Sequence, residues 1–135
     1  MKNQIEKTIL HEIYIKLTEN DVVVNSLDFS TKICGKYRQY YINSKRYNYD
    51  LTIETTINCV INIRKLLRIY KEQNSSLGFI HSEKITSLAE CEEILNNYLR
   101  VKFRVKEIID PNDPDYYDEN NDGYDDNDGY YPIII

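Results

Sequence analysis

The residues with an evident capacity for chemistry are few, and the most suggestive group lies near the C-terminus. The spacing D-x-N-x-D-G, the first half of a calcium loop, is carried by Asp118, Asn120 and Asp122 with the glycine that follows. Oxygen ligands at alternate positions can converge on a hard cation. The twelfth position of such a loop is Gly129, where a bidentate glutamate is required. We therefore predict only weak binding of divalent cations by an acidic segment, with no specific metal site and no cofactor.

Catalytic patterns are missing from the sequence. His11 and His81 are the only histidines, and no nucleophile-elbow, zinc-protease, phosphate-loop or dinucleotide-binding motif occurs. The three cysteines, Cys34, Cys59 and Cys91, are widely spaced and form no C-x-x-C pair. Each has apolar neighbours, so we expect three buried free thiols. The sequence favours a protein that is not an enzyme.

The net charge of −5 is divided unevenly along the chain. Residues 110–135 carry nine acidic side chains and no Lys or Arg, whereas residues 1–109 carry 17 bases and 13 acids. A segment rich in Asp, Asn and Tyr buries too little apolar surface to offset the entropy of ordering. We predict a compact α+β interaction domain over residues 1–109 and a disordered acidic tail over residues 110–135. The terminal isoleucines are expected to dock on the domain or on a partner.

A nucleic-acid-binding role is the main alternative that the charges suggest. Basic residues gather in two groups, Lys32, Lys36, Arg38, Lys45 and Arg46 in a tyrosine-rich segment, and Lys102, Arg104 and Lys106 near the end of the predicted domain. Bases of this kind can follow a phosphate backbone while tyrosines stack on nucleobases. A solvated charged face is the commoner explanation. In this alternative the protein binds nucleic acid or is associated with transcription, and its basic body is masked by the acidic tail. A separate possibility is an inhibitor whose tail imitates a polyanion.

Near the N-terminus the pattern of apolar residues predicts two strands. Ile13, Ile15 and Leu17 alternate with polar positions, and three consecutive valines follow a short polar turn. Alternation of this kind is typical of a strand with one buried face. We therefore predict a β-hairpin over residues 12–25.

The middle of the chain is predicted to combine helices with short extended segments. One or two short helices are expected within residues 26–42, interrupted at Gly35. Alternation predicts a strand over residues 47–53. A long stretch without Gly or Pro predicts a helix over residues 54–73, with basic residues near its C-terminal end. Residues 77–85 are expected to be extended.

A capped amphipathic helix is predicted over residues 88–99. Ser87 precedes the apolar run and Glu90 follows three residues later, which is a capping-box pattern. Alternating apolar and basic residues then predict a strand over residues 100–106. The expected fold class is α+β, with an N-terminal β-hairpin and a small sheet packed with helices.

This order of elements resembles the core shared by Skp-type cullin adaptors, elongin C and BTB/POZ domains. The residues that carry the resemblance are the I-K-L strand and turn at 14–24, the strand-to-helix step at 53–70, and the ending N-Y-L-R-V-K at 97–102. That ending is similar to the N-Y-L-x-[I/V]-K ending of the last core helix in Skp-type adaptors. The resemblance covers about residues 12–109 and implies a BTB/POZ-like fold, in which residues 101–109 form a turn and the start of a further helix.

The resemblance also implies a function. Members of this family are not enzymes; they recruit substrate receptors to cullin ubiquitin ligases, or they dimerise. A non-catalytic adaptor or oligomerisation module is therefore implied, whose partner is a cullin, a substrate receptor or a second copy. The partner contacts implied by the resemblance are Tyr70, Asn74, Ile85, Leu95, Tyr98 and Leu99. From the sequence alone, Leu95 and Leu99 suit a hydrophobic core equally well.

The sequence gives no indication of a membrane partner. Charges are spread through the first 16 residues, unlike a signal peptide, and no apolar run approaches the ~20 residues that span a bilayer. We expect a cytoplasmic or nuclear location, in a reducing compartment.

Overall fold

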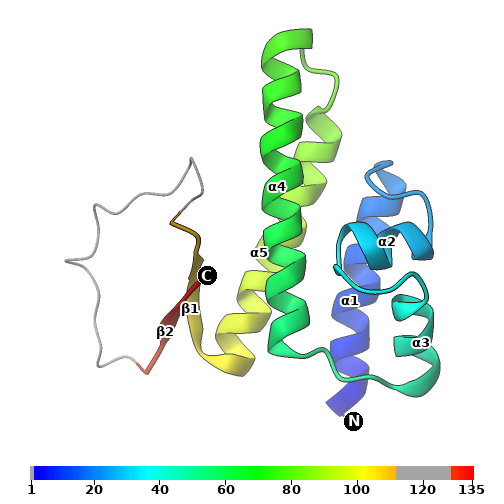
Figure 1. Ribbon diagram of the computed structural model, residues 1–135, viewed down its shortest axis with the longest axis vertical. Coiled ribbons are helices and arrows are strands. Elements are labelled where there is room, and N and C mark those ends of the chain that lie inside the picture. Colours follow the sequence, from blue (N-terminus) through cyan, green and yellow to red (C-terminus); the bar gives the residue numbers. More distant parts are fainter. Residues whose placement is uncertain (1, 112–128) are drawn as a thin grey trace. The chain divides into compact units, whose positions relative to one another are not determined.

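A computed structural model describes residues 2–111 and 129–135, with side chains from residue 9 onward. The elements in chain order are α1 (Lys2–Glu19), α2 (Ser26–Lys32), α3 (Tyr40–Tyr47), α4 (Ile53–Leu77), α5 (Ser82–Phe103), β1 (Val105–Ile109) and β2 (Tyr131–Ile134) (Figure 1). The described chain is mostly helical with a small two-stranded parallel sheet, so the α+β class is confirmed at that level. Among the described residues, none of the helices has the length and apolar character needed to cross a bilayer.

The predicted hairpin over residues 12–25 is wrong, because this segment is the end of α1 and a turn. The buried residues Leu10, Ile13 and Leu17 recur at helical spacing, whereas Ile15, part of the apparent alternation, is 37% exposed. Apolar residues that alternate over so few positions can occur in a strand or in a helix. The spacing of the buried residues shows which of the two is present, and here it is helical.

A left-handed residue ends α1. Asp21 has φ 60°, its N–H donates to the carbonyl of Thr18, and the N–H of Val22 donates to that of Leu17 at 2.8 Å. This pair of bonds is a Schellman motif, in which an apolar residue after the left-handed position packs back on the helix. Val22 and Val23 are each 1% exposed, which explains the valines that looked like a strand.

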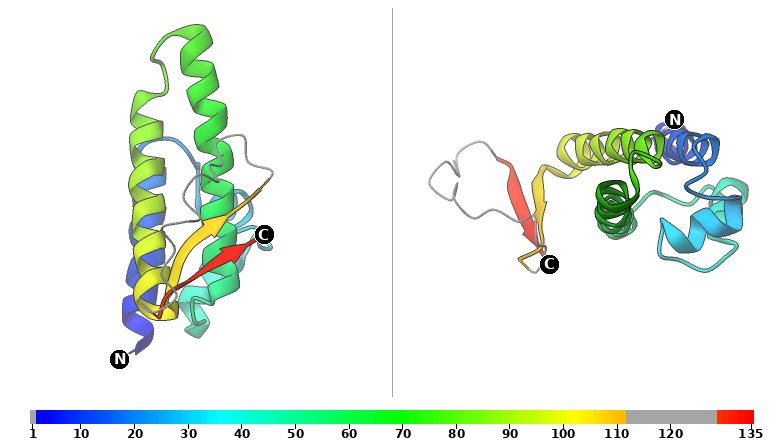
Figure 2. Two further views of the ribbon diagram at one scale, coloured as in Figure 1. Left: turned by 90° about the vertical axis from the view of Figure 1, so that its left-hand side faces the viewer. Right: turned by 90° about the horizontal axis from the view of Figure 1, so that it is seen from above.

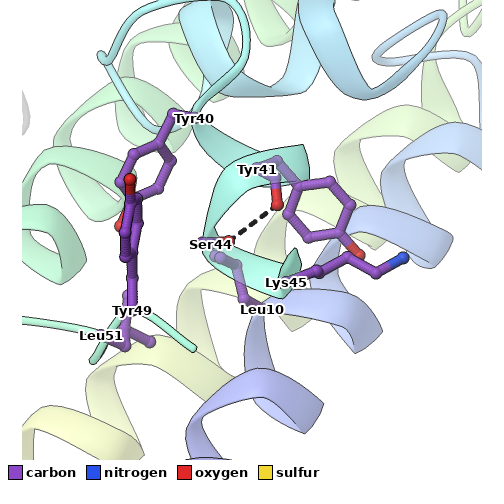
Figure 3. A pocket seen from close by; sticks show the side chains of 7 residues that line it. All are labelled: Leu10, Tyr40, Tyr41, Ser44, Lys45, Tyr49 and Leu51. Atoms are coloured by element: carbon purple, nitrogen blue, oxygen red, sulfur yellow. Dashed lines mark hydrogen bonds between the residues drawn. The ribbon is translucent and has the colours of Figure 1, made fainter. Parts of the chain in front are cut away.

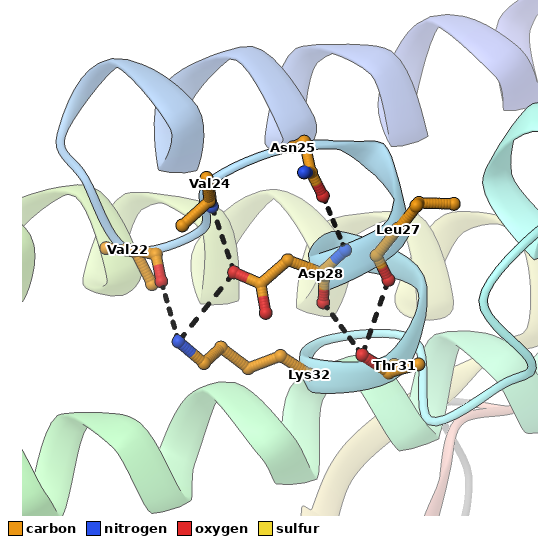
Figure 4. A network of polar contacts seen from close by, with 7 residues as sticks. All are labelled: Val22, Val24, Asn25, Leu27, Asp28, Thr31 and Lys32. Atoms are coloured by element: carbon orange, nitrogen blue, oxygen red, sulfur yellow. Dashed lines mark hydrogen bonds and ion pairs between the residues drawn. The ribbon is translucent and has the colours of Figure 1, made fainter.

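Side-chain capping fixes the start of α2 (Figure 4). The Oδ1 atom of Asn25 accepts from the N–H of Asp28 at 2.9 Å, and the Asp28 carboxylate accepts from the N–H of Val24 at 2.9 Å. Lys32 closes the network, because its Nζ atom donates to the carbonyl of Val22 at 3.1 Å and lies 3.9 Å from Asp28. Backbone groups left without partners at a helix start are thereby satisfied.

Replacing the cap residue tests this network. Asn25→Ala should lower the free energy of unfolding by about 1 kcal/mol, because the N–H of Asp28 loses its acceptor. Asn25→Ser, which retains a capping oxygen, should lose much less. Urea unfolding followed by circular dichroism measures both. Equal stability of the two variants would contradict a capping role.

One or two short helices were predicted within residues 26–42; the structure has two, α2 and the start of α3, with Gly35 between them. Gly35 has φ +65° and lies against α4, where an added Cβ would approach the Asn62 side chain at 3.3 Å. Asn62 also donates to the carbonyl of Ile33 at 2.9 Å. A hydrogen bond from Asn62 therefore joins the connection between the two short helices to α4.

The predicted strand over residues 47–53 is wrong. Asn48 takes the left-handed conformation with φ 57° and caps α3. Tyr47 and Tyr49 are 60% and 39% exposed, so their alternation does not mark a buried strand face. Thr52 then begins α4 by accepting from the N–H of Thr55 at 3.1 Å.

The helix predicted over residues 54–73 is confirmed as α4 and extends further at its C-terminal end. α4 and the first part of α5 lie side by side and antiparallel (Figures 1 and 2). An ion pair joins them, with Arg64 Nε 2.8 Å from Glu92 Oε2. Both side chains are 23% exposed, so the pair is partly shielded from water.

The helix predicted over residues 88–99 exists but begins earlier, at Ser82, so the extended segment expected at 77–85 is also wrong. Ser87 is not an N-cap: its hydroxyl donates to the carbonyl of Lys84 at 3.0 Å inside the helix, where the residue is buried. The S-x-x-E pattern is therefore accidental here, because apolar spacing continues on its N-terminal side at Ile85.

The chain divides into two compact units, Met1–Leu95 and Asn96–Ile135. In the second unit Arg104, which has φ 58°, follows the last residue of α5, so the strand expected over residues 100–106 is displaced to β1. β2 runs parallel to β1, with Ile133 opposite Ile108 and Ile134 opposite Ile109. The terminal isoleucines thus pair with their own chain. The division predicted at residues 109 and 110 remains a prediction, and the expected disorder of residues 112–128 lies outside the described residues.

Candidate functional site

The connection between α4 and α5 is held by side-chain contacts. Asn74 Oδ1 accepts from the N–H of His81 at 2.8 Å, and the rings of His81 and Tyr70 lie 4.7 Å apart between centroids. Lys84 Nζ lies 5.6 Å from the centroid of Tyr70, within the range of a cation–π contact. Gly78, with φ +88°, permits the sharp end of α4. These contacts join His81 of the loop to α4, and α4 to α5.

This ordered loop presents large apolar side chains to water. Leu77, Phe79 and Ile80 are 66%, 87% and 61% exposed. They lie where the helical hairpin of α4 and α5 turns, and we call these three residues the hairpin tip. An open groove of about 490 Å³ lies beside the tip. Its lining residues are Lys71, Asn74, Ser75, Gly78, Phe79 and Ile85. A hydrogen-bonded loop that exposes three neighbouring apolar side chains is a candidate contact surface for another molecule.

The groove is uncharged except for one cation. Lys71 is the charged residue in its lining and is exposed. Behind the groove, burial raises the pKa of Tyr70, and the nearby carboxylate of Asp28 raises it further. Tyr70 therefore stays neutral at physiological pH. The groove thus combines the apolar side chains of Phe79 and Ile85 with polar groups and a single positive charge, that of Lys71.

The six predicted partner contacts fall into two groups. Tyr70, Asn74 and Ile85 lie together where α4 meets α5, the first two holding the loop and the third lining the groove. Leu95, Tyr98 and Leu99 are 0%, 7% and 1% exposed. For Leu95 and Leu99 this is the core role that the sequence left open. Sequence reasoning missed Phe79, the most exposed large apolar side chain among the described residues.

A second surface is formed by tyrosines around α3. Tyr37, Tyr47 and Tyr49, which we call the tyrosine surface, are 53%, 60% and 39% exposed. The hydroxyls of Tyr37 and Tyr49 are 3.5 Å apart, and the rings of Tyr47 and Tyr49 stack with centroids 6.3 Å apart. Hydrogen bonds from Tyr49 and then Asn43 lower the pKa of Tyr37. These contacts fix three rings that remain open to solvent.

A small pocket lies behind the tyrosine surface (Figure 3). The side chains that line it come from Leu10, Tyr40, Tyr41, Ser44, Lys45, Tyr49 and Leu51. Its volume of about 10 Å³ has room for about one water molecule. Burial raises the pKa of Tyr41, whose hydroxyl lies 2.9 Å from His11 Nδ1. The pocket is too small for an organic substrate. The raised pKa keeps Tyr41 neutral.

The remaining chemical groups are dispersed or buried. Cys34, Cys59 and Cys91 are free and buried, which confirms the expectation from their apolar neighbours. Within residues 2–111 and 129–135, no cluster of three or more His, Cys, Asp or Glu side chains is arranged to hold a metal ion. The calcium-like residues Asp118, Asn120 and Asp122 lie outside the described residues.

Comparison with known proteins returns no match to any family model, curated protein or solved structure. The resemblance to Skp-type adaptors and BTB/POZ domains is therefore neither supported nor contradicted by relatives. Of the segments that carried the resemblance, residues 14–24 form a helix and a turn, not a strand. The long helix is present as α4, and the motif at 97–102 lies at the end of a helix, α5. The family assignment stays a hypothesis.

Proposed function

We propose that this chain is a non-catalytic protein–protein interaction module that binds its partner at the hairpin tip. The observation that carries the proposal is the 87% exposure of Phe79 on a loop whose backbone is hydrogen-bonded into place. Leaving a large aromatic ring in water forfeits free energy that burial against a partner recovers. Aromatic anchors of this kind carry much of the binding energy in protein interfaces.

The partner best suited to this surface is an amphipathic helix of another protein. An open channel lined by Phe79 and Ile85 accepts apolar side chains at helical spacing. Lys71, at the edge of the channel, favours a carboxylate on the same helix. An adaptor role follows from this mode of binding, whether or not a cullin ligase is the setting.

Site-specific crosslinking tests the proposal. A photo-reactive amino acid is placed at Phe79 or, as a control, at Val24, which is 80% exposed in the turn before α2. We expect a discrete crosslinked partner from position 79 and none from position 24. A crosslink of the same kind from both positions would count against a specific surface.

The purified partner is then titrated against variants of the full chain. Phe79→Ser should weaken binding at least about tenfold, the effect of removing an interface anchor. Lys71→Glu should also weaken it, because a carboxylate would face a carboxylate. Val24→Ser, which removes an apolar side chain of similar exposure, should leave the affinity unchanged. Equal affinities for all four proteins, or self-association as the only product, would exclude the proposed mode.

A further inference from the structure

The tyrosine surface has properties that the proposed protein contact does not use. Between Phe29 and Tyr49 the chain carries five bases and no acid. Two arginines of this segment flank the surface in sequence: Arg38 follows Tyr37, and Arg46 precedes Tyr47. Both arginines are exposed. Exposed aromatic rings and exposed cations are therefore neighbours in sequence around α3.

Two other bases of the segment are engaged with the protein. Lys36 Nζ lies 3.8 Å from Glu54 Oε1, and Lys45 Nζ lies 5.2 Å from the ring centroid of Tyr41. Neither contact places a carboxylate beside Arg38 or Arg46. The net charge of the whole chain is −5, but a charge more than a Debye length away, about 10 Å at 0.1 M salt, is largely screened. Asp50, which follows Tyr49, and Glu54, which pairs with Lys36, are the acids next to this segment on its C-terminal side, and its five bases outnumber them.

We propose that the tyrosine surface, together with Arg38 and Arg46, binds single-stranded nucleic acid. Every nucleobase has a π face, so an exposed tyrosine ring is a platform on which unpaired bases stack without regard to sequence. Arg38 and Arg46 supply the cations that contact the phosphates between stacked bases. Duplex DNA is excluded as the preferred ligand because its bases already stack on one another.

The rings contact one another in the free protein, which favours stacking over a loose electrostatic contact. Tyr47 and Tyr49 are inclined by only 29° to each other, and Tyr37 is joined to Tyr49 through their hydroxyls. Tyr40, buried beneath, packs edge-on against Tyr37 and at 6.1 Å from Tyr49. A fixed platform loses less conformational entropy when a ligand binds.

The test is fluorescence anisotropy with a labelled fifteen-nucleotide oligothymidylate and the full chain. Tyr47→Ala should weaken binding about tenfold, in keeping with one lost stacking contact. Tyr47→Phe retains the ring and should bind as the parent protein does. Because Tyr47 is 60% exposed, neither change should alter the thermal melting curve, which is recorded for each variant.

Charge variants separate this site from general attraction. Arg38→Gln with Arg46→Gln should reduce the slope of log affinity against log salt by about 1.4, at about 0.7 per phosphate contact. Lys65→Gln with Arg100→Gln changes the net charge equally at exposed positions of α4 and α5 and should leave the slope unchanged. A duplex of equal length should bind more weakly. No binding of the oligonucleotide at low salt, or equal loss in both charge variants with no effect of Tyr47→Ala, would overturn the proposal.

Discussion

Phe29→Ala should remove about 3–5 kcal/mol from the free energy of unfolding, a large part of the 5–15 kcal/mol typical of a domain. Phe29 lies in α2 and is 0% exposed. Its ring packs edge-on against Tyr14 at 5.3 Å and against Tyr41 at 5.2 Å, and these two tyrosines lie 4.8 Å apart. Deleting the ring removes two aromatic contacts and leaves a cavity that three helices surround.

A matched control is available on the surface. Phe79→Ala is the same chemical change at a side chain that is 87% exposed, and should alter stability by no more than about 0.5 kcal/mol. Urea denaturation of both variants, followed by circular dichroism, gives the comparison. Similar midpoints for the two variants would contradict the placement of Phe29 in the core.

The part of the fold that could be predicted from the sequence is the part with long, uninterrupted helical periodicity. α4 has no Gly or Pro within it, and Cys59, Val60, Ile63 and Leu67 are buried along one side. Over so many residues only a helix satisfies the spacing. The burial of the cysteines followed for a related reason, since a thiol among apolar neighbours behaves as a small hydrophobic side chain.

The β-hairpin over residues 12–25 was mispredicted because the short alternating run was interpreted without the residues on either side of it. Ile13 and Leu17 satisfy both periods, Ile15 fits only a strand, and Leu10, one turn earlier, decides in favour of a helix. Helix ends were harder still. α1, α3 and α5 are followed by Asp21, Asn48 and Arg104, each with positive φ, whereas sequence reasoning looks first for glycine at such positions.

The candidate surfaces were predicted only in part. Tyr70, Asn74 and Ile85 were named from a family resemblance, and the structure brings them together around the loop between α4 and α5. Phe79 carries no local signal, because a lone phenylalanine beside a glycine reads equally well as core or surface. The pairing of β2 with β1 joins segments distant in sequence, and such pairing is not encoded in either segment alone.

Alkaline solution should destabilise this protein through Cys91. Burial raises the pKa of the Cys91 thiol from its ordinary 9.0 to about 12; the carboxylates of Glu90 and Glu12 add to the shift, and Lys16 opposes it. The thiol is 0% exposed and lies 4.0 Å from the carbonyl of Ile13. Unfolding therefore releases a proton at any pH between these two values.

The sign of the effect follows from proton binding. Above pH 9 the unfolded state holds fewer protons than the folded state, so the free energy of unfolding falls as pH rises. The contribution of Cys91 is fully present below pH 9 and is about 1.4 kcal/mol smaller at pH 10, since each unit of pKa difference is worth that amount. It continues to fall until the folded thiol itself ionises.

Cys91→Ala isolates this contribution. Urea unfolding under reducing conditions at pH 7 and pH 10 should show a smaller loss of stability in Cys91→Ala than in the parent, by about 1.4 kcal/mol. Ser87→Ala, a buried substitution in the same helix that removes no titrating group, should lose as much between the two pH values as the parent does. A thiolate absorbance that develops near pH 9 in the folded protein would contradict the burial of Cys91, because a thiol in water ionises there.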